Sequence, residues 1–196
     1  MNLFTNRIRL GNLAAGLGFI CLALTMNADT NAVKALFDFQ TTTNQAGWQV
    51  VNDDVMGGVS RSTFTVTNGA AVFRGEVSLE NNGGFASVRS QPARHDLSGC
   101  QTIVLRVRGD GRRYKFTVRT ETGWDAPLYQ VSFPTKRGVW EEQRLAMKDF
   151  VPTFRGRVLT GAPPLDPAKV VSVGLLIADQ QAGPFEVEIA FIRAEQ

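Results

Sequence analysis

The side chains best suited to bind a ligand lie in two loops rich in asparagine, aspartate and glycine. Clustered side-chain oxygens on a loop can coordinate a hard cation or hydrogen-bond to sugar hydroxyls. The same residues also form turns, because asparagine and aspartate side chains bond to their own backbone and glycine adopts positive φ. Both interpretations stay open here. The candidate ligand-binding residues of these loops are Asn52, Asp53, Asn81 and Asn82.

Four basic residues are predicted to share one face of a β-hairpin. Apolar and polar residues alternate on both sides of the turn Gly109-Asp110-Gly111, which is the pattern of two neighbouring strands. A row of this kind could bind carboxylates, phosphates or an acidic partner in a bidentate manner. The alternative is a solvated face that forms ion pairs with Glu186 and Glu188. The row consists of Arg106, Arg108, Lys115 and Arg119.

Two further candidates rest on single residues. Trp124, in the loop from Glu121 to Pro127, could stack on a sugar ring, anchor a protein interface or simply cap the core. Asp38, near the first strand, and Glu188, in the last strand, could hold a structural calcium ion if these strands pair. The alternative for both is an ordinary surface carboxylate. No other cofactor is expected.

The chain is poor in the residues that catalytic sites require. His95 is its one histidine, so a site with several histidine ligands is excluded and a Ser-His-acid triad would depend on this residue. The sequence contains no G-x-S-x-G motif, no P-loop and no complete dinucleotide-binding glycine loop. We therefore expect a binding protein and not an enzyme.

Residues 1–32 are interpreted as a signal peptide or an N-terminal anchor. Arg7 and Arg9 precede a largely apolar run from Leu10 to Met26, and the first 28 residues contain no acid. Export, with a periplasmic or membrane-anchored product, is the favoured interpretation. The alternatives are a mitochondrial presequence, or a cytoplasmic protein that starts at Met26. Removing the two arginines leaves 19 basic and 18 acidic residues, so no nucleic-acid partner is expected.

Residues 33–196 are predicted to form a single all-β domain. Short apolar runs alternate with period two between glycine turns, and roughly ten strands are too many for a small open sheet. Two packed sheets in a jelly-roll β-sandwich are therefore expected, with Phe191 facing the core like Phe185. The predicted strands are 49–52, 62–66, 70–77, 85–90, 103–108, 114–119, 128–133, 139–145, 170–178 and 185–191, with a long loop over 152–169.

Five stretches resemble signatures of the complex I intermediate-associated protein family. The resemblance implies a galactose-binding-like jelly roll, related in shape to carbohydrate-binding modules. It also implies kinship with eukaryotic assembly factors for mitochondrial NADH:ubiquinone oxidoreductase. Arg155 joins the candidate binding residues because it lies in one of these stretches. They are Trp48–Ser60, Asn81–Arg89, Arg106–Tyr114, Phe150–Arg157 and Ile177–Phe185, within a match from about Phe37 to Ile192.

These observations predict a non-enzymatic module that binds a protein, such as a respiratory-complex subunit or an assembly intermediate. The alternative is a carbohydrate-binding module of the cell envelope, because a shared fold does not fix function. An export signal would place the chain across a membrane from the peripheral arm of complex I. The first hypothesis depends on the arginine row, and the second depends on Trp124 and the two polar loops.

Overall fold

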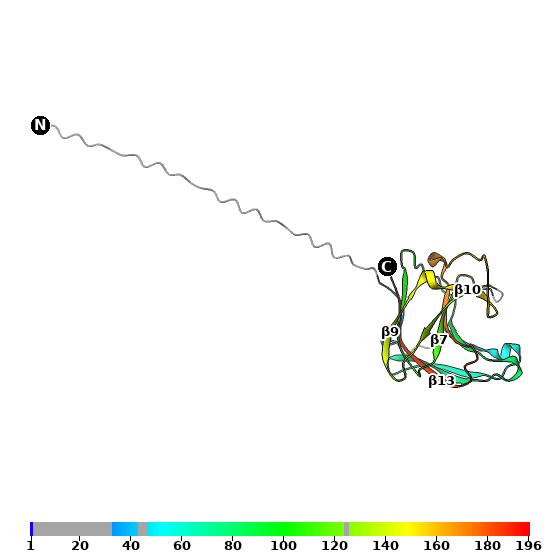
Figure 1. Ribbon diagram of the computed structural model, residues 1–196. Coiled ribbons are helices and arrows are strands. Elements are labelled where there is room, and N and C mark those ends of the chain that lie inside the picture. The colour runs from blue at the N-terminus through cyan, green and yellow to red at the C-terminus, as the bar shows by residue number, and fades with distance from the viewer. Residues whose placement is uncertain (2–32, 43–46, 124–125) are drawn as a thin grey trace. The chain divides into compact units, whose positions relative to one another are not determined.

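Two antiparallel sheets pack face to face in the computed structural model of the chain (Figure 1). The structure describes Met1 and residues 33–42, 47–123 and 126–196. Sheet A has the order β3 (Arg61–Thr67), β4 (Ala70–Val77), β13 (Gly183–Glu195), β6 (Thr102–Gly109) and β9 (Trp140–Ala146), and β1 (Lys34–Asp38) also pairs with β13.

Sheet B forms the second layer of the sandwich. Its order is β11 (Arg157–Val158), β10 (Val151–Phe154), β8 (Leu128–Pro134), β7 (Arg113–Arg119), β12 (Ser172–Ile177), β5 (Ala86–Ser90) and β2 (Trp48–Asn52). The described 3-10 turns are η1 (Asp53–Met56), η2 (Glu80–Asn82), η3 (Met147–Asp149) and η4 (Pro167–Lys169). Within the described ranges, no helix has the length and apolar character needed to cross a membrane.

The predicted all-β sandwich is confirmed, and each of the ten predicted strands corresponds to a strand of the structure. The predicted loop 152–169 is partly wrong, because β10 and the short β11 occupy its first part. Proline has no backbone N–H to donate, but Pro152 still fits inside β10 because it takes part through its carbonyl. This carbonyl accepts a hydrogen bond from the Leu159 amide at 2.9 Å.

The core lies between the sheets and follows the predicted alternation. The inward side chains of β6 pack in the same apolar cluster as those of β7. Burial of each such side chain contributes about 1.5–3 kcal/mol, so the core provides the main stabilisation. The inward residues of these two strands, each at most 1% exposed, are Ile103, Leu105, Val107, Tyr114, Phe116 and Val118.

The predicted hairpin of β6 and β7 is wrong, because the two strands belong to different sheets. The segment after Gly109 crosses from sheet A to sheet B, and Thr135 supports this corner. Its hydroxyl donates to the Arg112 carbonyl at 2.8 Å and accepts from the Gly111 amide at 3.2 Å. Both strands still turn their apolar residues inward, so their polar residues point out of opposite faces of the sandwich.

The long strand β13 organises sheet A. Its first half pairs with β4, its second half pairs with β1, and β6 lies along its other side. The register with β6 shifts between Ile189 and Phe191, which marks a bulge at Ala190. The bulge reverses the alternation, so the prediction that Phe191 faces the core is wrong, and its ring packs under Arg193 at 4.4 Å.

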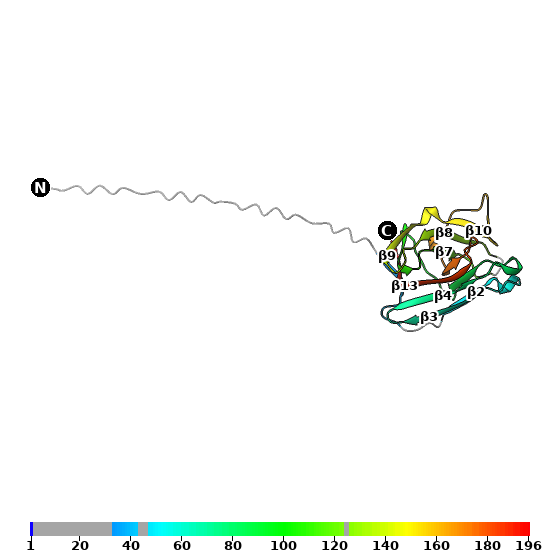
Figure 2. The ribbon, with the colours of Figure 1, turned by 60° about the horizontal axis from the view of Figure 1, so that its bottom comes forward.

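Aromatic rings close the sandwich beside β2. The Trp48 ring from sheet B lies 4.9 Å from the Phe64 ring and 4.8 Å from the Phe37 ring, both from sheet A. These contacts hold the start of β2, the strand that leads into η1, against the opposite layer. Figure 2 shows η1, in cyan, at the end of the domain beyond β2.

Candidate functional site

Asp53 joins the two polar loops through one buried carboxylate. It begins η1, directly after β2, and is 0% exposed. Oδ1 accepts a hydrogen bond from the Ser60 amide at 2.9 Å, and Oδ2 accepts from the Ser60 hydroxyl at 2.5 Å. Oδ2 also accepts from the amides of Gly84 at 2.6 Å and Phe85 at 3.2 Å. We call this set of contacts the Asp53 latch.

The latch keeps the carboxylate charged. Burial by itself raises the pKa of Asp53, but the hydrogen bonds from Ser60, Gly84 and Phe85 outweigh burial and hold the pKa below its ordinary value. Both carboxylate oxygens therefore serve as acceptors for the protein's own donors. This geometry favours a structural role for Asp53 over the role of a metal or sugar ligand.

Two glycines are required because they approach this carboxylate closely. A β-carbon on Gly58 would overlap the Asp53 side chain, and a β-carbon on Gly83 would lie 2.6 Å from Oδ2. Gly58 belongs to the first loop and Gly83 to the second. The glycines that look like turn residues in the sequence are therefore also part of the packing around the latch.

The latched loops carry four exposed apolar side chains. These side chains are Val55 at 62%, Met56 at 60%, Val59 at 42% and Leu79 at 46% exposure. We call them the apolar tip. The Ser60 hydroxyl oxygen links the two halves of the tip, because it accepts a hydrogen bond from the Ser78 amide at 3.0 Å while its proton is donated to Asp53. Exposed apolar side chains on a fixed backbone are typical of protein-binding surfaces.

The asparagines beside the tip act mainly as turn and strand-end residues. The Asn52 side-chain oxygen accepts a hydrogen bond from the Ser62 hydroxyl at 2.6 Å. Asn81 and Asn82 are exposed and have φ values of 54° and 59°, in the left-handed region that asparagine tolerates. The exposed carboxylates of Asp54 and Glu80 flank the same loops.

The four basic residues of the predicted row do not share one face, and that prediction is wrong. Arg106 and Arg108 lie on the outer face of sheet A, whereas Lys115 and Arg119 lie on the outer face of sheet B. The hairpin signal misled because the turn at Gly109 changes sheets. A surface that needs all four residues together is therefore excluded.

The arginines of sheet A are paired with acids and aromatic rings. Arg108 makes a bidentate ion pair with Glu188 at 2.7–3.0 Å, which raises the pKa of Arg108. Its guanidinium lies 5.1 Å from the Trp140 ring, and that of Arg106 lies 5.8 Å from the same ring. The alternative of ion pairing is confirmed for Arg108 and Glu188.

Further ion pairs continue across this surface, which we call the paired face. Arg193 lies 3.6 Å from Glu142 and 3.0 Å from Glu195, and Arg144 lies 2.5 Å from Glu195. The hydrogen bond from Arg144 is the main cause that lowers the pKa of Glu195. On sheet B, Lys115 pairs with Asp179 at 2.6 Å. These charges already have partners within the chain.

A second arrangement of charge lies on the outer face of sheet B. Arg89 and Arg119 line one groove of about 160 Å³, which we call the arginine groove. Burial lowers the pKa of both residues, and the nearby charge of Arg89 lowers that of Arg119 further. The full lining is Gln49, Arg89, Ser90, Gln91, Pro92, Arg119, Glu121, Thr122, Gly123 and Ser172.

Arg89 is a candidate that the sequence reasoning missed. The prediction considered Arg119 together with Arg106 and Arg108, which lie on the other sheet. The signal that could have found Arg89 is its outward position in the alternating strand 85–90, because Val88 and Ser90 on either side are buried. Pairing this strand with the correct neighbours requires the sheet order, which the sequence does not reveal.

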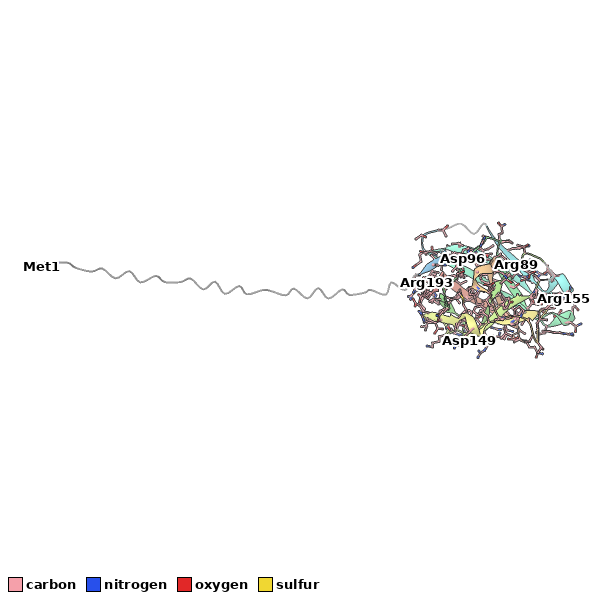
Figure 3. The ribbon with its side chains drawn as sticks, turned by 90° about the horizontal axis from the view of Figure 1, so that it is seen from above. Met1, Arg89, Asp96, Asp149, Arg155 and Arg193 are labelled. Atoms are coloured by element: carbon pink, nitrogen blue, oxygen red, sulfur yellow. The ribbon has the colours of Figure 1, made fainter. Side chains whose placement is uncertain are left out.

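The remaining candidates do not form a common site with these residues. Trp124 lies outside the described residues. Arg155 is exposed after β10 with its guanidinium 5.1 Å from the Phe154 ring, and Figure 3 places it at the opposite end of the domain from Arg193.

The structure does not bring Asp38 and Glu188 to one site. Asp38 is opposite Phe191 in the register, three positions along β13 from Glu188, and both Glu188 oxygens are held by Arg108. Among the described residues, no group of three histidine, cysteine, aspartate or glutamate side chains is placed to hold a metal ion.

Solved structures with a similar fold include two kinds of carbohydrate-related protein. A family 11 carbohydrate-binding module from Clostridium thermocellum, in complex with a β-1,3-1,4-mixed-linked tetrasaccharide, has a TM-score of 0.64 at 14% identity over 83% of this chain and 94% of that chain. The agarase AgWH50C has a TM-score of 0.57 at 12% identity over 84% of this chain and 24% of that chain. At these identities the likeness shows the jelly-roll fold alone.

Curated relatives carry the name complex I intermediate-associated protein 30, mitochondrial. The mouse protein is 28% identical over 81% of this chain and 55% of its own length. The Neurospora crassa protein is 30% identical over 68% of this chain and 50% of its own length, and the Drosophila melanogaster protein is 28% identical over 82% and 62%. The chain thus spans between half and two thirds of these relatives.

A family model supports the same assignment. The model for complex I intermediate-associated protein 30 matches residues 37–189, from β1 to the middle of β13. This range includes both latched loops, the arginine groove and the paired face apart from Arg193 and Glu195. The chain therefore belongs to the complex I intermediate-associated protein 30 family.

Proposed function

We propose that the chain is a non-enzymatic module that binds a subunit or an assembly intermediate of NADH:ubiquinone oxidoreductase. Family membership supports this function, since the curated relatives are named for association with complex I intermediates. The observation that carries the proposal is the apolar tip, because the four side chains are exposed while the backbone beneath them is fixed by the Asp53 latch.

A fixed backbone makes these side chains effective in binding. A partner that covers them gains up to about 1.5–3 kcal/mol for each side chain that becomes fully buried. The latch reduces the conformational entropy lost on binding, since the two loops are already held together. Asp54 and Glu80 are exposed acids that stand next to Val55 and Leu79 in the sequence. We therefore expect a partner surface with an apolar centre and basic residues at its edge.

The environment of His95 supports a role without catalysis. Its ring lies 5.9 Å from the Phe37 ring, and its buried Nε2 atom has no hydrogen-bond partner among the residues that the structure describes. Burial lowers the pKa of His95. A triad needs an acid bonded to one ring nitrogen and a hydroxyl bonded to the other. The relatives are likewise named as associated factors and not as enzymes.

The test is affinity capture from native cells after mild crosslinking. The tagged wild-type chain is compared with a Val55→Ser/Met56→Ser variant and with Val158→Ser, a control of similar exposure on β11. We expect complex I subunits with the wild type and the control, and a loss of about tenfold or more in the tip variant. Equal capture by all three forms would contradict the tip as the binding surface.

The compartment of the chain can be determined in the same cells. The relatives' names support the mitochondrial alternative and lend no support to export, which stays a prediction for the leader. We expect the chain to fractionate with the compartment that contains the peripheral arm of complex I. Recovery only from an exported fraction would remove access to that arm and would contradict the proposed partner.

Carbohydrate binding is a second candidate function. The observation that favours it is the neutral polar part of the arginine groove, where Gln49, Gln91 and Ser172 offer hydrogen-bonding groups to a hydroxyl-rich ligand. In this case binding to a glycan should be saturable, abolished by Gln49→Ala and unaffected by Met56→Ser. Binding lost in neither variant, or lost in both, would count against a sugar site in this groove.

A further inference from the structure

We propose that a groove on the outer face of sheet A binds a segment of the protein partner that carries both acidic and basic side chains. This inference rests on the proposed function, because the segment is assigned to the partner that covers the apolar tip. The groove has a volume of about 810 Å³, and all its lining residues belong to the described ranges. It carries five exposed charged residues, which we call the open charges: Arg61, Arg74, Glu76, Arg137 and Glu186.

The pairing of three strands sets four of these charges in two rows across the floor of the groove. Arg61 on β3 is opposite Glu76 on β4, and Arg74 on β4 is opposite Glu186 on β13. Figure 2 shows these three strands side by side. Phe185, which precedes Glu186 along β13, is buried in the core. Glu186 and its neighbours across the sheet therefore point outward.

The next row along the same sheet is different. There Arg108 and Glu188 are also opposite each other, and they form a bidentate ion pair at 2.7–3.0 Å. Within the described ranges, none of the open charges takes part in an ion pair or a side-chain hydrogen bond. The charge of Glu186 does reach Arg108, whose pKa it helps to raise. Charges that are closed on the paired face are thus available in the groove.

The wall of the groove is held by contacts that occupy its own polar groups. Both Asp110 oxygens accept hydrogen bonds at 3.0 Å, one from the Arg112 amide and one from the Glu186 amide. The Arg112 guanidinium donates to the carbonyl of Gln181 at 2.7 Å and to that of Ala182 at 2.9 Å. This wall therefore shapes the groove and leaves the open charges to contact a partner.

The groove begins where the apolar tip ends. Val59 of the tip is two positions before Arg61, and Leu79 of the tip is three positions after Glu76. Protein interfaces commonly combine an apolar centre with a polar, charged margin. A partner that covers the tip can therefore extend over the open charges as one continuous surface.

The two signs of charge indicate which segment fits. Three of the open charges are positive and two are negative. A purely acidic segment would be repelled by the two glutamates, and a purely basic segment would be repelled by the three arginines. A segment with both signs can pair with every open charge. The aromatic ring among the described lining residues, that of Phe185, is buried and offers no surface on which a sugar could stack.

The experiment measures capture of complex I subunits by the tagged chain at low and at high salt. The arginine variant is Arg61→Gln/Arg74→Gln, and the acid variant is Glu76→Gln/Glu186→Gln. Each should reduce capture about tenfold at low salt, because each removes contacts of opposite charge with the partner. The reduction should be smaller at high salt, since salt screens exposed charges.

Control variants separate the groove from general charge and from misfolding. Arg94→Gln/Arg157→Gln removes two exposed arginines outside the groove and should leave capture unchanged. Met56→Ser should reduce capture by the same factor at both salt concentrations, because its contact is apolar. Circular dichroism melts verify each fold. If a double variant does not fold, Arg137→Gln, in the exposed connection between β8 and β9, should still reduce capture about threefold at low salt.

Several results would overturn the proposal. Increased capture by the acid variant would indicate a purely acidic partner segment, and an equal loss in the Arg94→Gln/Arg157→Gln control would show general charge attraction. A soluble glycan that displaces the subunits would assign the groove to a hydroxyl-rich ligand. A dimer of the isolated chain that is lost in the arginine variant would assign the groove to a second copy. Full capture by both groove variants, while capture still depends on Met56, would reject this inference and leave the proposed function intact. Absence of capture by the wild type would reject both.

Discussion

The Asp53 latch and the paired face both depend on charged side chains, but in opposite environments. Asp53 is 0% exposed and accepts four hydrogen bonds from protein donors, whereas the Arg108 side chain is 41% exposed beside Glu188. Water can replace the partner of a surface charge and cannot readily reach a buried one. The comparison teaches that a carboxylate with the sequence context of a ligand serves to hold two loops together, and that the arginines of the paired face form an exposed surface of ion pairs.

The largest effect is expected for Asp53→Asn. The neutral amide keeps the shape of the side chain but presents N–H groups to donors that need an acceptor. We expect the free energy of unfolding to fall by about 3 kcal/mol. Urea denaturation measures this change, and Asp54→Asn in the neighbouring exposed position is the matched control, with a change within about 0.5 kcal/mol. Equal effects at both positions would contradict the latch.

Acid should weaken the same contacts. The pKa of Asp53 is lower in the folded chain than its ordinary value of 3.8. Its ionisation therefore contributes stability that is fully present above the unfolded pKa and is lost as pH falls through the folded pKa. Below about pH 4, wild type should lose more stability than Asp53→Asn, and the difference between them should shrink. Parallel stability curves from pH 6 to pH 2 would argue against a depressed pKa.

Gly83→Ala should have an intermediate effect. The added methyl group would lie 2.6 Å from the Asp53 carboxylate, so the loops must shift. We expect a loss of about 1–3 kcal/mol, as for other overpacked sites. Repeating the substitution in an Asp53→Ala background provides the control, because the space vacated by the carboxylate should reduce the additional loss. The same loss in both backgrounds would mean that the glycine acts independently of the latch.

The smallest effect is expected for Arg108→Gln on the paired face. Exposed ion pairs contribute about 0–1 kcal/mol, and salt screens them. Arg108→Gln and Glu188→Gln should each change stability by at most about 1 kcal/mol in urea denaturation, with a smaller change at high salt. Capture of complex I subunits should not change. A loss as large as that of Asp53→Asn would erase the distinction between the two regions.

Much of the fold could be predicted from local pattern. Period-two alternation located every long strand, because one face of each strand is buried against the other sheet. The identity of the neighbouring strands could not be predicted in the same way. The turn at Gly109 has the composition of a hairpin, yet Thr135 holds it as a corner between sheets. The bulge at Ala190, which reverses Phe191, likewise has no clear signal in the local sequence.

The candidate site was predictable only in outline. The two polar loops were identified as important, but their chemistry was not, because an aspartate in a turn and an aspartate in a buried latch look alike in sequence. Asp53 and Gly84 are separated by 31 positions, and only the tertiary structure shows their hydrogen bond. Arg89 was missed for a related reason. It lines the same groove as Arg119 only because β12 lies between β5 and β7 in sheet B.

The position of β13 has a consequence for how the chain folds. This strand occupies the centre of sheet A, pairs with β4, β6 and β1, and follows all other strands in the sequence. During synthesis, sheet B can assemble from earlier strands, whereas the middle of sheet A stays open until the ribosome has nearly finished the chain. Pairing of Lys34 with Ala194 then closes a very long loop. Such non-local contacts make folding slow and leave strand edges open to aggregation in the meantime.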